Sequence, residues 1–165
     1  MIIVGVDPGV TGSIACLAEN WSSVWDMPIH ETRKNGKKRH KYDAIKIASI
    51  FREIGPSQVF LEEIGAAPPP SSGKSRFSRG SVATAQLVRC VGLIEGICIA
   101  LGNTVHLVRP NTWKAVIFGQ KRTEKNDSLV LARKLFPVAP LKLKKYHNRA
   151  EAYLLAHYGR LFVKG

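Results

Sequence analysis

Residues 2–18 read IIVGVDPGVTGSIACLA, and this stretch predicts two neighbouring strands joined by a tight turn. Residues 2–6 form a continuous apolar run, which is typical of a strand covered on both faces. The glycine-rich residues 9–12 predict the turn, and residues 13–18 predict a second strand paired with the first as a hairpin. Asp7 stands at the end of the buried strand, where a carboxylate is costly unless a cation or a metal ion meets it.

The remaining sequence predicts an α/β fold in which a mixed five-stranded sheet is flanked by helices. Further strands are expected at 22–29, 58–62 and 104–108, and helices at 43–54, 81–101, 110–118, 123–136 and 148–160. Residues 66–80 are rich in proline, serine and glycine and predict a long loop, and residues 137–145 predict a basic linker. The strongly basic residues 31–41 predict a flexible loop or the tip of a hairpin. Residues 1–165 are expected to form a single domain.

The charge balance predicts a polyanionic partner. Twenty-five Lys and Arg residues stand against 12 Asp and Glu residues, which gives a formal net charge of +13. Such an excess on a small chain most often indicates nucleic acid binding. A merely basic protein without such a partner is the plain alternative. A membrane surface is not expected, because the basic residues do not alternate with an apolar helical face.

Cysteine usage and hydropathy predict a reducing compartment. The three cysteines, Cys16, Cys90 and Cys98, form no CxxC pair and lie in apolar segments, so reduced thiols are expected. No apolar run approaches the roughly 18 residues of a membrane span. The chain begins directly with a strand, so we expect no signal peptide and a cytoplasmic location, or the host nucleoid if a bacteriophage encodes it.

The few acidic residues are arranged as a metal site would require. Asp7 ends the first strand and Glu62 ends the strand at 58–62, so both carboxylates would meet at one sheet edge if these strands are adjacent. His147 and Glu151 are four residues apart and would share one face of the last helix. Gathered carboxylates repel one another unless divalent cations neutralise them, and two such cations support phosphodiester hydrolysis. Taken singly, each residue is equally explained as a turn, surface or helix-start residue.

These residues bring a family resemblance into view. The motifs VGVDPGxTG, LEE after a strand, WK after RPxT, and RAEAxLLA together resemble those of RuvC-type Holliday junction resolvases. The branch found in bacteriophages and plastids is the more similar one, because FSRG (77–80) resembles its motif after the second acid. The resemblance implies a ribonuclease-H-like fold, a homodimer and dependence on Mg²⁺, with Mn²⁺ as a substitute. It also implies paired symmetric nicks in four-way branched DNA, a reaction of recombination and repair that leaves 5′-phosphate and 3′-hydroxyl ends.

The resemblance also implies the roles of individual residues. Asp7, Glu62 and Glu151 match the family's acids, and Glu63 would point the other way along its strand. His147 is our choice for the fourth metal ligand, and Asn148, three residues before Glu151, is the rival. Lys121 matches a basic residue that would stabilise charge developing on the scissile phosphate.

Basic residues gather in three segments that would contact DNA. The first segment is 31–41 and the second is 74–79, where Phe77 would stack on a base or insert as a wedge at the junction centre. The third is 142–149, which lies beside the proposed metal site. The expected DNA-binding residues are Lys37, Lys38, Arg39, Lys74, Arg76, Phe77, Arg79, Lys144 and Lys145. A solvated loop at 31–41, a phenylalanine that only anchors its loop and a solvated Lys121 remain the alternatives.

The helix expected at 81–101 is apolar on almost every side, more than the core of one domain needs. A homodimer interface would use the surplus and would supply two symmetric active sites. A fully buried central helix is the alternative.

Three other functions share part of this pattern. The DPGVTG turn also resembles the phosphate loop of actin-like ATPases, but 165 residues are too few for their two domains, so no nucleotide cofactor is expected. A catalytically weakened protein that binds junctions without cutting them is a second possibility, because Asn148 stands where a carboxylate is common. A related nuclease for flaps or other branched DNA is the third.

Overall fold

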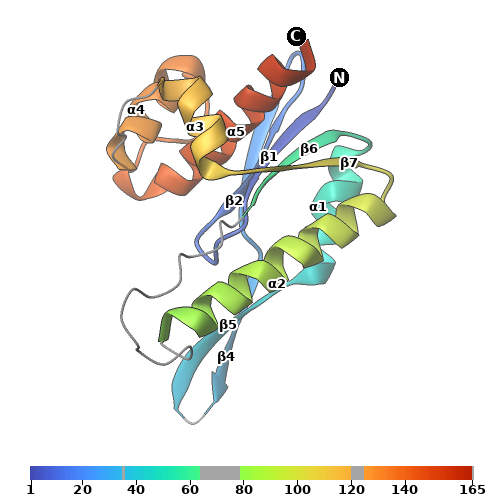
Figure 1. Cartoon of the computed structure of the whole chain (residues 1–165), viewed down its shortest axis with the longest axis vertical. Helices are drawn as coiled ribbons and strands as arrows, with labels where there is room; N and C mark the ends of the chain where they lie inside the picture. The colour runs from blue at the N-terminus through green and yellow to red at the C-terminus, as the bar shows by residue number, and fades with distance from the viewer. Residues whose placement is uncertain (35, 64–78, 120–124, 165) are drawn as a thin grey trace.

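The computed structural model describes residues 1–34, 36–63, 79–119 and 125–164 (Figure 1). Its central sheet has five strands in the order β3-β2-β1-β6-β7. The strands are β1 (Ile3–Asp7), β2 (Ser13–Leu17), β3 (Ser22–Asp26), β6 (Gln58–Glu62) and β7 (Thr104–Val108). β2 pairs antiparallel with both β1 and β3, whereas β6 lies parallel to both β1 and β7. The predicted mixed five-stranded sheet is therefore confirmed.

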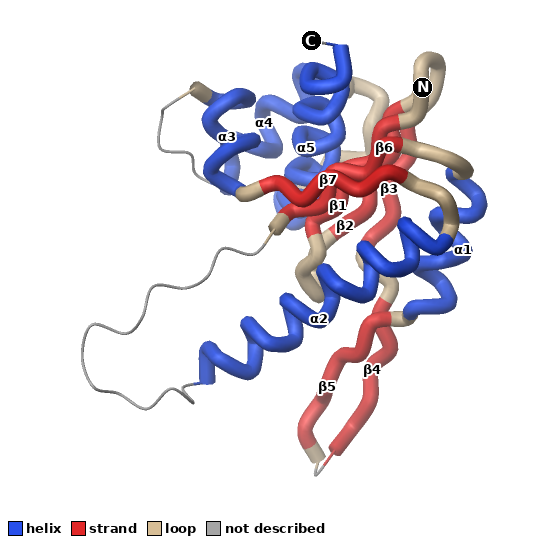
Figure 2. Tube along the Cα trace, turned by 45° about the vertical axis from the view of Figure 1, so that its right-hand side comes forward, coloured by secondary structure: helices blue, strands red, loops and turns tan. Residues whose placement is uncertain are grey.

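Helices cover both faces of this sheet (Figure 2). α1 (Ala44–Ile54) and α2 (Arg79–Ala100) pack on one face, against Val4, Val6 and their neighbours. α3 (Pro110–Phe118), α4 (Lys125–Leu135) and α5 (His147–Lys164) lie over the other face, against Ile3, Phe60 and their neighbours. Successive side chains along each strand point to opposite faces of the sheet, so they alternate between these two cores. Within the described ranges, no helix combines the length and the apolar character that crossing a membrane requires.

Gly5, in the middle of β1, allows α5 to approach the sheet closely. A Cβ atom placed there would collide with the α5 backbone at Ala152 and Ala156. A second close approach occurs where Gly159 of α5 faces the ring of Phe60. Any larger side chain at either glycine would push α5 away from the sheet. The glycine of the opening VGVD motif therefore fixes α5, which carries His147 and Glu151, directly over β1.

The basic segment after β3 is a hairpin rather than a flexible loop. The third predicted strand ends at Asp26, and a separate two-stranded sheet follows, made of β4 (Ile29–Lys34) and β5 (Lys37–Tyr42). Figures 1 and 2 show this hairpin projecting from the central sheet beside the first half of α2. Its polar sequence forbids burial but not strand pairing, because backbone hydrogen bonds hold the ladder irrespective of the side chains.

The other predicted boundaries differ from the structure by a few residues. Asp43 caps α1 as expected, and its carboxylate accepts a hydrogen bond from the backbone N–H of Lys46 at 3.0 Å. α2 begins two residues earlier than predicted, and α5 continues four residues further, to Lys164. The predicted linker at 137–145 runs into a short 3-10 helix, Lys144–Tyr146. Thr123, the predicted start of the fourth helix, lies outside the described residues.

Candidate active site

The parallel pairing of β1 with β6 places Asp7 and Glu62 at the same sheet edge. The register runs from Ile3 opposite Gln58 to Val6 opposite Leu61, so the two acids directly follow the last pair. Both side chains share the strand face of Phe60, which is the face that α5 covers. Glu151, one turn into α5, completes a group of three carboxylates drawn from β1, β6 and α5.

Burial and repulsion by neighbouring carboxylates raise the pKa values of Asp7 and Glu62 and so disfavour their ionised forms. The pKa of Asp7 is raised to about 6, mainly by burial and to a smaller extent by Glu151, while the backbone N–H of Gly9, which donates at 3.2 Å, opposes the rise. Burial also raises the pKa of Glu62 to about 7, with smaller contributions from Asp7 and Glu151. A bound cation would reverse both shifts, because it favours the charged form of a carboxylate.

Two residues of α3 hold the carboxylates in place. The indole N–H of the fully buried Trp113 donates to Glu62 at 2.9 Å. The ammonium of Lys114 lies 3.2 Å from Glu151, and its charge lowers the pKa of both Asp7 and Glu62. Neither residue was among the predicted site residues, although the WK motif of the family resemblance contains both. That motif was the available signal, because no local pattern shows that α3 returns to the strand ends.

The remaining contact to Glu151 comes from α4. Ser128 is buried, and its hydroxyl donates to the same Glu151 oxygen that Lys114 contacts, at 3.3 Å. Glu151 is therefore oriented by a hydroxyl and an ammonium from two different helices. Sequence reasoning did not single out Ser128, because its distance of 23 residues from Glu151 gives no local sign of the contact.

His147 and Asn148 occupy different positions at the start of α5. The charge of His147 lowers the pKa of Asp7, so the imidazole lies within electrostatic reach of the site. The amide of Asn148 instead donates a hydrogen bond to the backbone carbonyl of Thr11, in the turn between β1 and β2. Asn148 thus ties α5 to this turn.

The donor set fits a hard divalent cation, although the side chains are not yet gathered around one point. Carboxylate oxygens are the ligands that Mg²⁺ and Mn²⁺ prefer. Among the described residues, no group of three His, Cys, Asp or Glu side chains stands close enough to enclose a metal ion. In this structure the Lys114 ammonium forms an ion pair with Glu151 and supplies a positive charge to this carboxylate.

Several predicted DNA-binding residues lie in exposed segments, and others fall outside the described residues. Arg39 is exposed on β5, which also contains Lys37 and Lys38, and Arg79 is the first residue of α2. Lys144 and Lys145 are exposed in the 3-10 helix before α5. Lys74, Arg76, Phe77 and Lys121 lie outside the described residues.

One basic residue of the third segment is engaged within the protein. Arg149 contacts both carboxylate oxygens of Asp26 at 2.6 Å, and its guanidinium lies 4.1 Å from the centre of the Tyr146 ring. This bidentate pair lowers the pKa of Asp26. Arg149 therefore ties α5 to the end of β3 rather than offering an unpaired charge to DNA.

Asp7 and Glu62 should make the metal-free protein less stable as the pH rises. Between their unfolded-state pKa values near 4 and their raised pKa values of about 6 and 7, the folded protein binds more protons than the unfolded chain. The free energy of unfolding in EDTA should therefore fall from about pH 4 to about pH 7 and then level off. Asp7→Asn keeps an acceptor for Gly9 but removes the charge, so it should raise this free energy at pH 8 by about 2 kcal/mol.

Asp26→Asn is the matched control for that measurement. The pKa of Asp26 is lowered by Arg149, so the same substitution there should destabilise the protein at pH 8. Thermal unfolding at several pH values, in EDTA and in Mg²⁺, tests both expectations. Destabilisation by Asp7→Asn in EDTA would show that the Asp7 carboxylate is not strained by its surroundings.

Comparisons with known proteins identify this architecture. No family model matches the chain. The chain is 28% identical to the chloroplastic Holliday junction resolvase MOC1 of Chlamydomonas reinhardtii over 155 residues, which is 84% of this chain but only 17% of that protein. The structure matches Thermus thermophilus RuvC with a TM-score of 0.58 at 14% identity, over 98% of this chain and 97% of that one.

A second structure, T. thermophilus RuvC in complex with a Holliday junction substrate, matches with a TM-score of 0.63 at 15% identity, over 98% of this chain and 96% of that one. The fold is therefore the ribonuclease-H-like fold in its RuvC form. The predicted resemblance to RuvC-type resolvases is confirmed, and its plastid-like branch fits the chloroplast relative.

Proposed function

We propose that this protein is a structure-selective endonuclease that resolves four-way DNA junctions by paired symmetric nicks. The observation that carries the proposal is the set of partly buried carboxylates from β1, β6 and α5, in a chain with a net charge of +13. The similarity to a chloroplastic Holliday junction resolvase supports the choice of substrate. We also propose that the 165 residues form one domain, in the cytoplasm or the host nucleoid.

Asp7, Glu62, His147 and Glu151 would hold the divalent cations, which we propose to be Mg²⁺, with Mn²⁺ as a substitute. Cations bound at these residues would activate a water molecule for attack and would neutralise negative charge on the phosphate. The position of His147 within electrostatic reach of Asp7 supports it as the fourth ligand. The hydrogen bond of Asn148 to Thr11 argues for a structural role of that residue.

The chain's own residues prepare the site in three ways. Gly9 and Trp113 orient Asp7 and Glu62 by hydrogen bonds. Lys114 supplies a positive charge beside the three carboxylates, where a phosphate group must approach. Such a positive charge would stabilise the negative charge that develops on the phosphate in the transition state. Lys121, which precedes α4 in sequence, remains proposed for a similar role.

DNA would be bound by basic residues on three sides of this site. We propose Lys37, Lys38 and Arg39 of the hairpin, Arg79 at the start of α2, and Lys144 and Lys145 before α5 as phosphate contacts. Lys74, Arg76 and Phe77 remain predicted contacts in the segment that links β6 to α2. Salt should weaken the binding steeply, because each cation that meets a phosphate releases counterions.

A cleavage assay on a labelled synthetic four-way junction tests the proposed function. It should be run with Mg²⁺, with Mn²⁺ and with EDTA, beside linear duplex and flap substrates. Symmetric, metal-dependent nicks in the junction alone are expected. Tight junction binding without nicks under any metal would instead assign a binding protein, and preferential cutting of flaps would assign a related branched-DNA nuclease.

The outer face of α2 supports a homodimer. Val88 and Ile99 on this face are 56% and 60% exposed. Gly92 and Gly96 lie between them, and a Cβ atom added at either glycine would meet no atom within 4 Å. Glycine inside a helix costs about 1 kcal/mol relative to alanine, so two glycines that the chain itself does not need indicate close approach of a second α2. A two-fold pair would also provide two cutting sites.

Gly92→Leu should convert the dimer to a monomer, because its side chain would block this approach. Light scattering coupled to size-exclusion chromatography should give about twice the 18.2 kDa chain mass for the unmodified protein and one chain mass for the variant. Gly92→Ala is the matched control, since it adds one methyl group, improves helix propensity and should leave most of the dimer intact. An unmodified protein that runs as a monomer, or a Gly92→Leu variant that stays dimeric, would remove α2 from the interface.

A further inference from the structure

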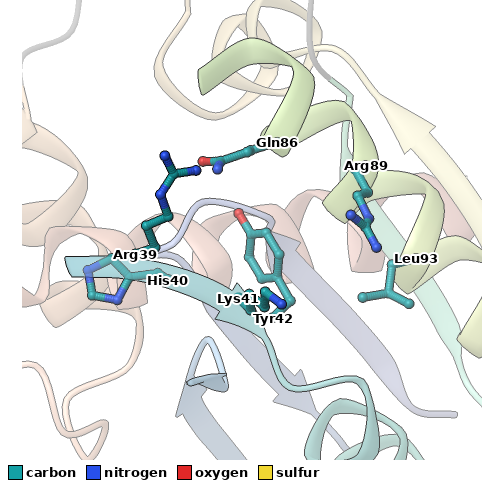
Figure 3. Close-up of a pocket in the computed structure, with 7 residues that line it drawn as sticks. All are labelled: Arg39, His40, Lys41, Tyr42, Gln86, Arg89 and Leu93. Atoms are coloured by element: carbon teal, nitrogen blue, oxygen red, sulfur yellow. The ribbon is translucent and has the colours of Figure 1, made fainter. Parts of the chain in front are cut away.

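A cavity of about 270 Å³ lies between the projecting hairpin and α2 (Figure 3). Strand β5 forms one side and the first half of α2 the other. Gln86, Arg89 and Leu93 recur at three- and four-residue spacing, so they share one side of α2. This side borders the outer face, because Arg89 and Leu93 each lie three residues before one of its glycines, Gly92 and Gly96. The cavity is lined by Arg39, His40, Lys41, Tyr42, Gln86, Arg89 and Leu93.

The chemistry of the lining selects an anion with an apolar part. Arg39, Lys41 and Arg89 are exposed cations, and none of the residues that line the cavity is acidic. Figure 3 shows the Arg39 and Gln86 side chains approaching one another across the cavity, with the Tyr42 ring between the strand and the helix. The ring of Tyr42 and the side chain of Leu93 provide an apolar wall. Guanidinium groups on the strand side and the helix side of the cavity could each donate hydrogen bonds to the oxygens of one phosphate.

Glu31, the acidic residue of the hairpin, is not among the residues that line the cavity. Glu31 pairs across the ladder with His40, and its side chain has its own interactions within the protein. The cavity therefore keeps a surplus of positive charge on both the strand and the helix side.

The base of the hairpin lies near the turn that follows Asp7. The backbone N–H of Met27, just before the hairpin, donates to the carbonyl of Gly12 in the turn between β1 and β2 at 2.9 Å. The hydroxyl of Tyr42 is hydrogen-bonded to the buried thiol of Cys90 on α2. The charge of Asp7 acts on both groups and raises the pKa of each, in addition to the larger effect of burial. A polymer seated between the hairpin and α2 would thus pass close to the strand ends where Asp7 stands.

We propose that this cavity is a phosphate subsite that holds the backbone of one DNA strand next to the cutting site, with Arg39 and Arg89 on opposite sides of a phosphodiester. The inference rests on the proposed function for the identity of the polymer. Tyr42 and Leu93 would contact the sugar or base of the same nucleotide, which favours an unpaired or distorted nucleotide over a regular duplex.

The test is the salt dependence of junction binding by an Arg39→Gln/Arg89→Gln variant, followed by fluorescence anisotropy in EDTA. Each lost phosphate contact should reduce the slope of log K against log salt by about 0.7 to 0.9, so the variant should lose between about 1.4 and 1.8. Arg52→Gln/Lys134→Gln is the matched control, because it removes the same charge from exposed positions on α1 and α4. A slope change no larger than that of the control would overturn the subsite.

Two further measurements separate the possible failures. If the unmodified protein binds the junction but does not cut it, and the slope still falls in the variant, the proposed nuclease activity fails while the subsite stands. If the unmodified protein cuts the junction and the slope is unchanged in the variant, the subsite alone fails. Inorganic phosphate should compete with the junction more strongly than chloride at equal ionic strength, and this excess should disappear in the variant. Equal competition by the two anions would contradict a phosphate-binding cavity.

Discussion

Asp7→Asn should abolish junction cleavage while leaving junction affinity nearly unchanged. The substitution preserves the size of the side chain and the acceptor for the Gly9 N–H, but it removes the negative charge that cations at the strand ends would require. We expect a loss of at least about 10³-fold in the single-turnover rate, equivalent to about 4 kcal/mol of transition-state stabilisation. Gel-shift titrations in EDTA and cleavage time courses in Mg²⁺ measure the two quantities separately.

Asp26→Asn again supplies the control, because Asp26 also ends a strand of the same sheet. Its carboxylate is bound by Arg149 on α5 rather than gathered with the other acids, so this variant should still cut the junction. Equal loss of cleavage in both variants would indicate that strand-end charge is needed for folding and not for chemistry. Loss of junction binding by Asp7→Asn would assign Asp7 a structural role.

Lys114→Met should reduce cleavage by about 10²-fold and should shift its pH dependence. The Lys114 ammonium contacts Glu151 at 3.2 Å and lowers the pKa of Asp7 and Glu62. Removing it takes away a charge that would stabilise the phosphate in the transition state. It also raises the pKa of both carboxyl groups, so the acidic limb of the pH–rate profile should move to higher pH.

The pH–rate profile distinguishes this role from a purely structural one. Lys134→Met is the control, since Lys134 is exposed on α4 and should be replaceable without a change in rate or profile. A slower Lys114→Met variant whose acidic limb does not move would contradict the electrostatic role. Cleavage rates should be measured at saturating protein concentrations, so that differences in DNA affinity between the variants do not affect them.

Local patterns predicted the parts of the fold that neighbouring residues control. The apolar run before Asp7, the strand ending at Glu62 and the capping by Asp43 all depend on contacts within a few residues. The positions of Asp7 and Glu62 at strand ends also predicted that the two carboxylates meet at one sheet edge if their strands are adjacent, and β1 and β6 do pair. For these elements the sequence is nearly sufficient.

The basic segment at 31–41 shows where local reasoning stopped. High charge predicts exposure, and the segment is indeed exposed, but exposure does not distinguish a loop from a hairpin. The same limit applied to Arg149, which was grouped with the DNA-binding cations by its neighbours in the chain. Its partner Asp26 is 123 residues away, and only the packing of α5 beside β3 brings the two together.

The sequence by itself determined the strands and helices outside the β4–β5 hairpin, the net charge and the placement of Asp7 and Glu62 at strand ends, because each follows from residues close together in the chain. Only the tertiary structure decided that α5 lies directly over Gly5, that Trp113 and Lys114 return to the carboxylates, and that the hairpin and α2 enclose a basic cavity. Lys114 contacts a carboxylate 37 positions away in the chain, and Trp113 contacts one 51 positions away. Their geometry is set by how whole elements pack, which no short stretch of sequence specifies.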